Sequence, residues 1–475
     1  VLTVFANPYS LIDFESAAQV NTLIAAYQNS DYAQHAAAEL IFGGIGANGK
    51  LPVSVSETFP AGTGLHVDPM NRFKYTWPEA VGMDASELYQ IDSIAMKGVK
   101  EEAYPGCQVL VAKNGNVIYN KSFGYHTYEK IKPVQNSDIY DLASITKIGA
   151  TLLSVMRLQD EGKFYLDSTL GDYLPHLIPD TSIYHPLILR EILAHQAGLQ
   201  AWVPFYVKTI RDGKLDTVIY RADSSTYYPL RVANNIYINK DYPDIIMQRI
   251  LRGPLKEKEY RYSDLGYYFL KHIVETQSGE EIEDYVAKIY ASLGMTTAGY
   301  LPRKRFSLER IPPTEYDEVF RKQVIHGDVH DPGAAMLGGV GGHAGLFSNA
   351  NDLAKLMQMY LNEGNYGGTQ YIKDTTVREY TKCQYCVDEN RRGAGFDKPV
   401  RDGDGGPTCS CVSYLSFGHS GFTGTIAWAD PEEDVVYIFL SNRIYPDAEN
   451  KKLLHLNIRT DIQEVIYNAI AHSKK

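Results

Sequence analysis

The chain lacks any long apolar run, and it lacks a block of basic residues. None of its apolar segments approaches the roughly 18 residues that a helix needs to cross a bilayer, so no membrane-spanning helix is predicted. Lysine and arginine together number 46 against 57 acidic residues, which leaves a net charge of −11. This balance disfavours nucleic acid and anionic membrane surfaces as partners.

The first residues also lack the pattern of a signal peptide. The chain opens instead with a strand-like apolar run, residues 1–5, so we expect a targeting segment and further chain to precede residue 1. The length of 475 residues predicts two to four domains, and an apolar fraction of 44% is ample for a large core.

Cysteine is scarce, with five residues. Four of them form two close pairs, Cys383 with Cys386 and Cys409 with Cys411, around a loop rich in arginine, glycine and aspartate. Both disulfides and a zinc site fit this grouping, although the one-residue gap of the second pair is shorter than zinc knuckles usually have. In an exported protein disulfides are the better interpretation. Either role is structural, Cys107 is expected to be a buried and inert thiol, and no cofactor is predicted.

The chemically most informative stretch is residues 141–150, where Ser144 precedes Lys147 by three positions. On a helix this spacing is just under one turn, so the hydroxyl and the amine share one face. An amine whose pKa is lowered by burial and by a neighbouring cation can take the proton of a serine and make it a nucleophile. The alternative is a capping serine with an exposed lysine. Apolar residues at helical spacing follow as far as Gly162, and they favour the first interpretation because they predict a buried helix.

A glycine-rich stretch, residues 338–345, lacks the Gly-Lys-Ser/Thr sequence of a phosphate-binding loop. A nucleotide site is therefore disfavoured, and we expect a tight loop near a catalytic cleft. His343 in this loop and His330 next to Asp331 could line that cleft, but a structural role is favoured for both.

The remaining pattern alternates helices and strands. A helix is expected from Asp84 to about residue 99, and Asn-Gly at 114–115 between two apolar runs is a strong hairpin signal. Helices are also expected at 189–199 and from after Tyr268 through Val274. A strand is expected from 417 through 428, a central strand at 435–441, and an amphipathic closing helix at 453–471.

These elements, taken with three motifs, resemble the serine β-lactamases and penicillin-binding proteins over roughly residues 78–472. The motifs are Ser-x-x-Lys at 144–147, Tyr262-Ser-Asp264, and His419-Ser420-Gly421 in place of Lys-Thr-Gly. The resemblance implies an α/β (α+β) fold in which terminal helices flank an antiparallel sheet. It also implies a mainly helical subdomain inserted at about 150–345, within a hydrolase domain at 84–472.

The resemblance also implies a role for each motif residue. Ser144 attacks a carbonyl with Lys147 as its base, and Tyr262 relays a proton as a phenolate that Lys147 stabilises. The backbone N–H groups of Ser144 and Phe422 form the oxyanion hole. Substrate-binding positions are Asp264, His419, Ser420 and Gly421.

Two of these positions depart from the family pattern. Asp264 stands where asparagine is common, and His419 stands where a lysine holds a permanent charge for a substrate carboxylate. The departures disfavour efficient β-lactamase action and favour the esterases, D-peptidases and muramyl-L-alanine amidases of the same fold.

The N-terminal residues 1–66 carry a second resemblance. The run at 33–53, with its glycine-rich loop and Gly49-Lys-Leu-Pro52, resembles the end of the α/β-sandwich domain of family 3 glycoside hydrolases. The catalytic barrel of that family would precede residue 1, so no glycosidase activity is expected from these residues. Residues 67–83, rich in proline and glycine, are expected to be a linker.

Family 3 includes N-acetylglucosaminidases that trim cell-wall fragments, so the fusion implies a muropeptide as the small-molecule substrate. We therefore expect a periplasmic or exported serine hydrolase. It would cleave an amide or peptide bond in peptidoglycan fragments through an acyl-enzyme, like a muramyl-L-alanine amidase or a D-Ala-D-Ala carboxypeptidase. The alternatives are a carboxylic-ester hydrolase, a weak β-lactamase, or a non-catalytic module that binds muropeptides or penicillin.

Overall fold

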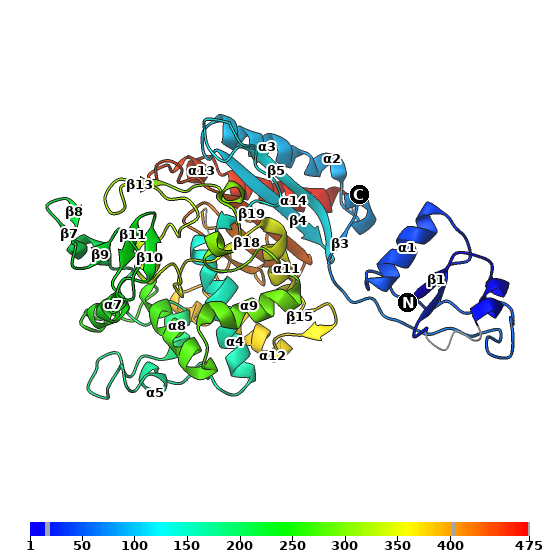
Figure 1. The fold of residues 1–475 in the computed structure, drawn as a ribbon, viewed down its shortest axis with the longest axis horizontal. Helices are drawn as coiled ribbons and strands as arrows, with labels where there is room; N and C mark the ends of the chain where they lie inside the picture. The colour runs from blue at the N-terminus through cyan, green and yellow to red at the C-terminus, as the bar shows by residue number, and fades with distance from the viewer. Residues whose placement is uncertain (15–19, 401–404, 474–475) are drawn as a thin grey trace. The chain divides into compact units, whose positions relative to one another are not determined.

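The computed structural model describes residues 1–14, 20–400 and 405–473. The chain forms two compact units, a smaller one of Val1–Tyr75 with Tyr366–Thr369 and a larger one of Thr76–Asn365 with Gln370–Lys475. The larger unit contains every predicted catalytic and substrate-binding residue. Figure 1 labels helices and strands of both units.

An antiparallel sheet forms the centre of the larger unit. Its neighbouring strands are, in order, β17 (Phe417–Ser420), β18 (Ile426–Asp430), β19 (Val435–Ser441), β4 (Gly106–Lys113) and β5 (Asn116–Gly124). The β4–β5 hairpin follows the prediction from Asn114-Gly115, and both turn residues have positive φ. Because β19 pairs with β4, the sheet combines strands that lie more than 300 residues apart in the sequence.

The prediction of one strand from 417 through 428 is wrong, because the chain reverses within it. Gly421 donates its N–H to the Thr425 carbonyl at 2.8 Å, and Gly424 has a φ of 102°. This left-handed conformation suits glycine and makes a tight turn between β17 and β18.

Helices cover both faces of the sheet. On one face, α2 (Ala85–Leu88), α3 (Gln90–Lys100) and α14 (Ile458–Ser473) pack on one another, and α3 also contacts β5. The α2 helix begins where the Asp84 carboxylate caps the Ser86 N–H at 2.8 Å. On the other face, α11 (Ala350–Leu361) packs against β4, β18 and β19.

The core follows from this layering. Alternate strand residues point toward α2, α3 and α14 and are buried with the apolar side chains of those helices. The buried strand residues are Cys107, Val109, Val111, Ile426, Trp428, Val435, Tyr437 and Phe439. Cys107 is a free and buried thiol, as predicted.

The chain between β5 and β17 is mainly helical. Its longer helices are α4 (Leu152–Asp160), α7 (Tyr242–Leu251), α8 (Leu265–Ser278), α9 (Ile282–Leu293) and α11. The shorter helices of the larger unit are α5 (Leu170–Tyr173), α6 (Leu189–Leu193), α10 (Pro332–Met336), α12 (Asp374–Thr381) and α13 (Lys452–His455). Short strands are β6 (Tyr140–Asp141), β9 (Tyr220–Arg221), β10 (Leu230–Ala233), β11 (Ile236–Ile238) and β14 (Phe347–Ser348). Two further two-stranded sheets pair β7 (Ile210–Arg211) with β8 (Lys214–Leu215) and β12 (Tyr316–Asp317) with β13 (Gln323–Val324).

The smaller unit has its own small core. Strand β1 (Leu2–Val4) pairs in parallel with β2 (Leu23–Ala25), and α1 (Asp31–Ile41) begins after its capping residue Ser30. Leu51 is buried with Val4 and Leu11, and residues 51–55 lie in a loop. The relationship to a glycoside hydrolase remains a prediction. No helix in the described residues has the length and apolarity needed to cross a membrane.

Candidate active site

Ser144 lies in a strained turn at the start of the buried helix. Ala143, just before it, has a φ of +47°, a conformation that costs free energy for a residue with a Cβ. The Asp141 carboxylate holds this turn, because one oxygen accepts the Ala143 N–H at 2.8 Å and the other accepts the His330 N–H at 2.7 Å. Strain of this kind is concentrated at functional sites.

The helix after Ser144 is not regular. A 3₁₀ turn (η3, Ala143–Ile145) leads into a π-helical turn (η4, Lys147–Thr151), and the α-helix α4 begins only at Leu152. Tyrosine hydroxyls from other helices bind the carbonyls of this π turn: Tyr290 reaches Gly149 at 2.7 Å, and Tyr360 reaches Ile148 at 2.8 Å. π turns inside helices are frequent at functional sites.

Three side chains far apart in the sequence meet at the Ser144 hydroxyl. Lys147 Nζ lies 2.9 Å from Ser144 Oγ, and the Tyr262 hydroxyl donates to the same oxygen at 2.9 Å across 118 positions of sequence. The structure thus brings together the alcohol, the amine and the phenol that the motifs indicate.

The pKa of Lys147 is raised, not lowered as the sequence argument assumed. The side chain is fully buried, and burial lowers its pKa, but Asp264 and Tyr262 raise it further than burial lowers it. Asp264 Oδ1 lies 2.7 Å from the amine. Lys147 is therefore an ammonium at neutral pH, which disfavours its predicted role as the base.

The pKa of Tyr262 is also raised, so the phenolate predicted for the proton relay is not the form that predominates at neutral pH. Burial raises it first, and the Asp264 carboxylate adds to the effect, while the nearby Lys147 ammonium opposes both. Lys147 Nζ lies 5.1 Å from the ring centroid. At neutral pH Tyr262 is a phenol that donates to Ser144.

His419 is present at the site but carries no charge. It is 2% exposed, and burial, together with Arg392 and Lys147, lowers its pKa to about 3. Its Nδ1 bonds the Ser420 carbonyl at 2.7 Å, and its ring centroid is 6.0 Å from that of Tyr262. The imidazole is thus neutral in the physiological range and gives no fixed charge for a substrate carboxylate.

The turn that carries Phe422 packs against the segment before Ser144. Thr423 and Thr425 donate their hydroxyls to the carbonyls of Asp141 at 2.8 Å and Leu142 at 3.2 Å. A Cβ on Gly421 would lie 2.5 Å from the Leu142 carbonyl oxygen, so only glycine allows this approach. The oxyanion-hole role of the Ser144 and Phe422 N–H groups and the substrate-binding role of Ser420 and Gly421 stay predictions.

Two residues at the site were missed from the sequence. The His195 ring centroid lies 4.5 Å from that of Tyr262, and its Nδ1 accepts the Ser263 N–H at 3.1 Å. Burial lowers its pKa well below the ordinary value, so it is neutral with its proton on Nε2. The guanidinium carbon of Arg392 lies 5.4 Å from the Tyr262 centroid. Both stand in segments that the sequence analysis identified only as a helix end and an arginine-rich loop.

The glycine-rich stretch at 338–345 lies against the catalytic helix. The His343 carbonyl accepts from Lys147 Nζ at 3.1 Å, and the Gly342 carbonyl accepts from the Thr151 hydroxyl at 2.6 Å. The His343 ring stacks on Tyr268 with its Nε2 2.7 Å from Asp331 Oδ1. The loop is therefore a support for Lys147, and the imidazole of His343 is held within it.

The four paired cysteines form disulfides, Cys383–Cys386 and Cys409–Cys411. The spacing had left both disulfides and a zinc site open, and the structure contains the disulfides. Part of the loop between them, residues 401–404, lies outside the described residues.

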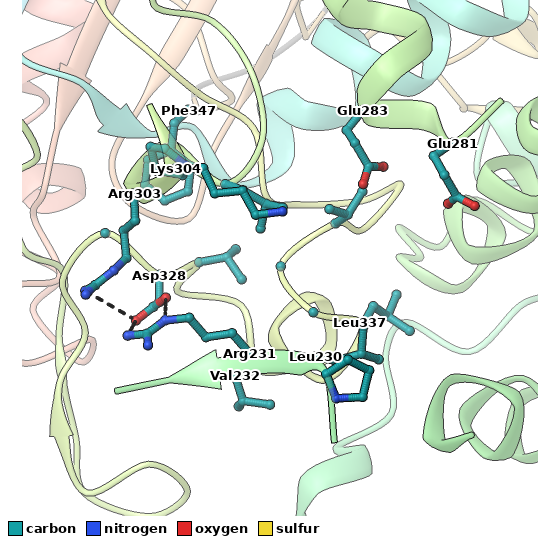
Figure 2. A pocket seen from close by; sticks show the side chains of 18 of the residues that line it. Leu230, Arg231, Val232, Glu281, Glu283, Arg303, Lys304, Asp328, Leu337 and Phe347 are labelled. Carbon is teal, nitrogen blue, oxygen red and sulfur yellow. Dashed lines mark hydrogen bonds and ion pairs between the residues drawn. The ribbon is translucent and has the colours of Figure 1, made fainter. Parts of the chain in front are cut away.

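A pocket of about 290 Å³ has Gly338, Gly339 and Val340 of the glycine-rich stretch in its lining (Figure 2). Carboxylates of Glu281 and Glu283 stand on one side, and on the other Arg231 binds Asp328 at 2.8 Å. None of the predicted catalytic or substrate-binding residues lines it.

The chain was compared with known proteins. The family described as Beta-lactamase matches residues 91–460. A putative D-alanyl-D-alanine carboxypeptidase of Escherichia coli (strain K12) is 30% identical over 407 residues, which cover 79% of this chain and 87% of that protein.

Solved structures share the fold at lower identity. EstCE1, a hydrolase with promiscuous acyltransferase activity, is 20% identical with a TM-score of 0.59 over 80% of this chain and 99% of its own. The octameric penicillin-binding protein homologue from Pyrococcus abyssi is 20% identical with a TM-score of 0.55 over 82% of this chain and 80% of its own. With the Ser144 site and a match across most of its length, the chain belongs to the Beta-lactamase family and is a serine hydrolase of the β-lactamase and penicillin-binding protein superfamily.

Proposed function

We propose that the protein hydrolyses an amide or peptide bond in peptidoglycan fragments through an acyl-enzyme on Ser144, in the manner of a D-Ala-D-Ala carboxypeptidase or a muramyl-L-alanine amidase. The observation that carries the proposal is that Ser144 Oγ lies 2.9 Å from both Lys147 Nζ and the Tyr262 hydroxyl. The carboxypeptidase description of its 30%-identical relative supports a cell-wall peptide as substrate.

The protonation states of Lys147 and Tyr262 determine the mechanism. In the resting protein Lys147 is an ammonium and Tyr262 a phenol, so both are donors toward Ser144 Oγ. The active form arises when Tyr262 loses its proton to solvent. The phenolate then accepts the Ser144 proton as Oγ attacks the carbonyl carbon, while the Lys147 ammonium stabilises the negative charge nearby.

The same phenol completes the reaction. Tyr262 gives the proton taken from Ser144 to the leaving amine as the C–N bond breaks, which leaves an ester on Ser144 and restores the phenolate. Water then attacks the ester carbon and gives a proton to the Tyr262 phenolate. Tyr262 returns this proton to Ser144 Oγ as the bond between Oγ and the acyl carbon breaks, which releases the carboxylic acid. N–H groups of Ser144 and Phe422 would hold the oxyanion in both steps.

Mass spectrometry of muropeptide digests tests this proposal. The wild-type protein is expected to release D-alanine from a pentapeptide stem, or to separate the stem from its sugar, and Ser144→Ala is expected to do neither. Ser154→Ala is the matched control, since Ser154 lies on α4, which follows the Ser144 turn, and donates its hydroxyl to the Ala150 carbonyl. The proposal is contradicted if Ser144→Ala cleaves the muropeptides, or if the wild-type protein does not cleave them.

An ester substrate is the second candidate. The specific observation in its favour is the neutral His419, which offers no fixed charge to a peptide carboxylate. Comparing the turnover of p-nitrophenyl esters with that of muropeptides separates the two. If a labelled penicillin binds but neither substrate is turned over in a Ser144-dependent way, the protein is a binding module. If the bound label is slowly released, the protein is a weak β-lactamase.

We further propose that the protein acts in the periplasm or outside the cell. The two disulfides support this location, because disulfides persist in oxidising compartments. Fusion to a glycoside hydrolase barrel ahead of residue 1 would place a sugar-cleaving and a peptide-cleaving site on one chain. A sequence of the full gene product tests the fusion directly.

A further inference from the structure

Arg392 is a second buried cation beside the catalytic tyrosine. Its side chain is 6% exposed, and its guanidinium carbon lies 5.4 Å from the Tyr262 ring centroid and 5.8 Å from that of Tyr260. A guanidinium over an aromatic face at this distance interacts with the ring electrostatically. Lys147 is 5.1 Å from the Tyr262 centroid, so two positive charges are close to one phenol.

The fold fixes this guanidinium next to the strand that carries His419. Arg392 Nη2 lies 3.3 Å from Asp397 Oδ2, and its Nε donates to the Tyr260 hydroxyl at 3.3 Å. The backbone of Asp397 exchanges two hydrogen bonds with Gly418, at 2.8 and 3.0 Å. Gly418 immediately precedes His419, so Asp397 joins the arginine to the active-site end of β17.

The charge of Arg392 is incompletely compensated. Asp397 also binds Arg391 at 2.9 Å, so one carboxylate is shared by two guanidinium groups. Arg392 Nη1 is buried and has no hydrogen-bond partner among the described residues. A buried donor of a charged group without a partner is costly, and a catalytic role is one of the explanations for such an exception.

The other groups that face Tyr262 do not supply this compensation. His195, after α6, and His419, on β17, are both neutral because burial and the nearby cations lower their pKa values. Burial raises the pKa of Tyr267, which is therefore a phenol, and the Tyr260 hydroxyl accepts from Arg392 Nε. Asp264, at the start of α8, is engaged by Lys147 at 2.7 Å. Among the described residues, Lys147 and Arg392 are thus the charged cations near the Tyr262 ring that could stabilise a negative charge on its oxygen.

We propose that Arg392 is a positioning residue that stabilises the deprotonated form of Tyr262 and so sets the pH at which Ser144 becomes reactive. The inference rests on the proposed roles of Ser144 and Tyr262. It assigns to a loop residue outside the three motifs a charge that His419, being neutral, does not provide.

The test is the pH dependence of acylation by p-nitrophenyl acetate, a neutral ester. In Arg392→Met, activity is expected to fall at least about tenfold at pH 7, and its rise with pH is expected to move upward by about one pH unit or more, because a nearby cation shifts a pKa by that amount. KM should change little. Arg392→Lys should recover part of both effects, and adding His419→Lys to Arg392→Met should restore the pH profile, because it returns a cation beside the Tyr262 ring.

Arg391→Met is the matched control. Arg391 binds the same carboxylate, but its guanidinium lies over Tyr260, 6.0 Å from that centroid, and it is 26% exposed. Its pH profile should match that of the wild type. A folded Arg392→Met with an unmoved pH profile overturns the inference, and so does a rise in KM confined to carboxylate-bearing substrates, which would make Arg392 a substrate anchor.

Two further variants cover the case in which Arg392→Met does not fold. The pH profile of ester turnover in Arg392→Lys must then lie within about half a pH unit of the wild-type profile. The profile of the single variant His419→Lys must move to lower pH. If either expectation fails, the inference is overturned. Failure of the proposed function looks different, because Ser144→Ala would then keep its ester turnover.

Discussion

The ammonium of Lys147 and the carboxylate of Asp264 form an ion pair of 2.7 Å inside the catalytic centre. The lysine is fully buried, whereas the aspartate side chain is 26% exposed. Because Asp264 raises the pKa values of both Lys147 and Tyr262, this pair holds the site in its protonated, resting form. The substrate-binding role predicted for Asp264 stays a prediction, and its carboxylate in addition favours the protonated forms of Lys147 and Tyr262.

Replacing Asp264 by asparagine is expected to activate the enzyme near neutral pH. Without the carboxylate, the Tyr262 phenolate forms at lower pH, so the rise of ester turnover should move downward by about one pH unit or more. The measurement is the pH dependence of kcat/KM for p-nitrophenyl acetate. Asp244→Asn, on the exposed side of α7, is the control, and an unmoved profile in a folded Asp264→Asn would refute this role.

Replacing Tyr262 by phenylalanine is expected to abolish most turnover without unfolding the protein. Loss of a positioned acid–base group costs about 10² to 10⁴ in rate, while loss of one hydrogen bond costs about 1 kcal/mol of unfolding free energy. Steady-state kinetics and urea unfolding measure the two quantities. Turnover within about tenfold of the wild type would exclude Tyr262 as the proton relay.

His419 is expected to make the protein less stable in acid. Its pKa is about 3 in the folded protein and about 6.5 when unfolded, so below pH 6.5 the unfolded chain binds more protons. The stability associated with the neutral imidazole is present above pH 6.5 and is lost, by about 1.4 kcal/mol per pH unit, as the pH falls toward 3.

Thermal unfolding of wild type and His419→Gln between pH 7 and 4 measures this effect. The variant should lose less stability than the wild type over that interval, because glutamine does not titrate. Parallel loss in the two proteins would mean that His419 is protonated in the folded state.

The cysteines give a test by thiol counting. With two disulfides and one buried thiol, the denatured protein should react with one equivalent of a thiol reagent, and with five after reduction. Metal analysis should find no stoichiometric zinc. Five reactive thiols without reductant, or one zinc per chain, would favour the metal site instead.

Patterns in the sequence were sufficient to predict the elements that follow from local chemistry. Asn114-Gly115 predicted the hairpin that begins the sheet, and the spacing of Ser144 and Lys147 predicted their contact even though the intervening turn is 3₁₀ and then π rather than α. Order along the chain, through the family resemblance, predicted that Tyr262 would reach the same hydroxyl.

The charge states of the residues at the site could not be predicted from such patterns. Whether a buried lysine is a base depends on which carboxylate lies within about 3 Å of it, and sequence order does not give that distance for Asp264. Arg392 and His195 reach Tyr262 from loops almost 200 positions apart, where no periodicity identifies a site. The neutral state of His419 likewise follows from burial and two cations that only the fold brings together.

The most direct test of the central claim is the site of covalent labelling. After reaction with a fluorophosphonate, peptide mapping by mass spectrometry is expected to find one adduct per chain, on Ser144, formed more slowly in Tyr262→Phe and absent from Ser144→Ala. Labelling of Ser144→Ala at the wild-type rate, or an adduct on another residue, would contradict the account.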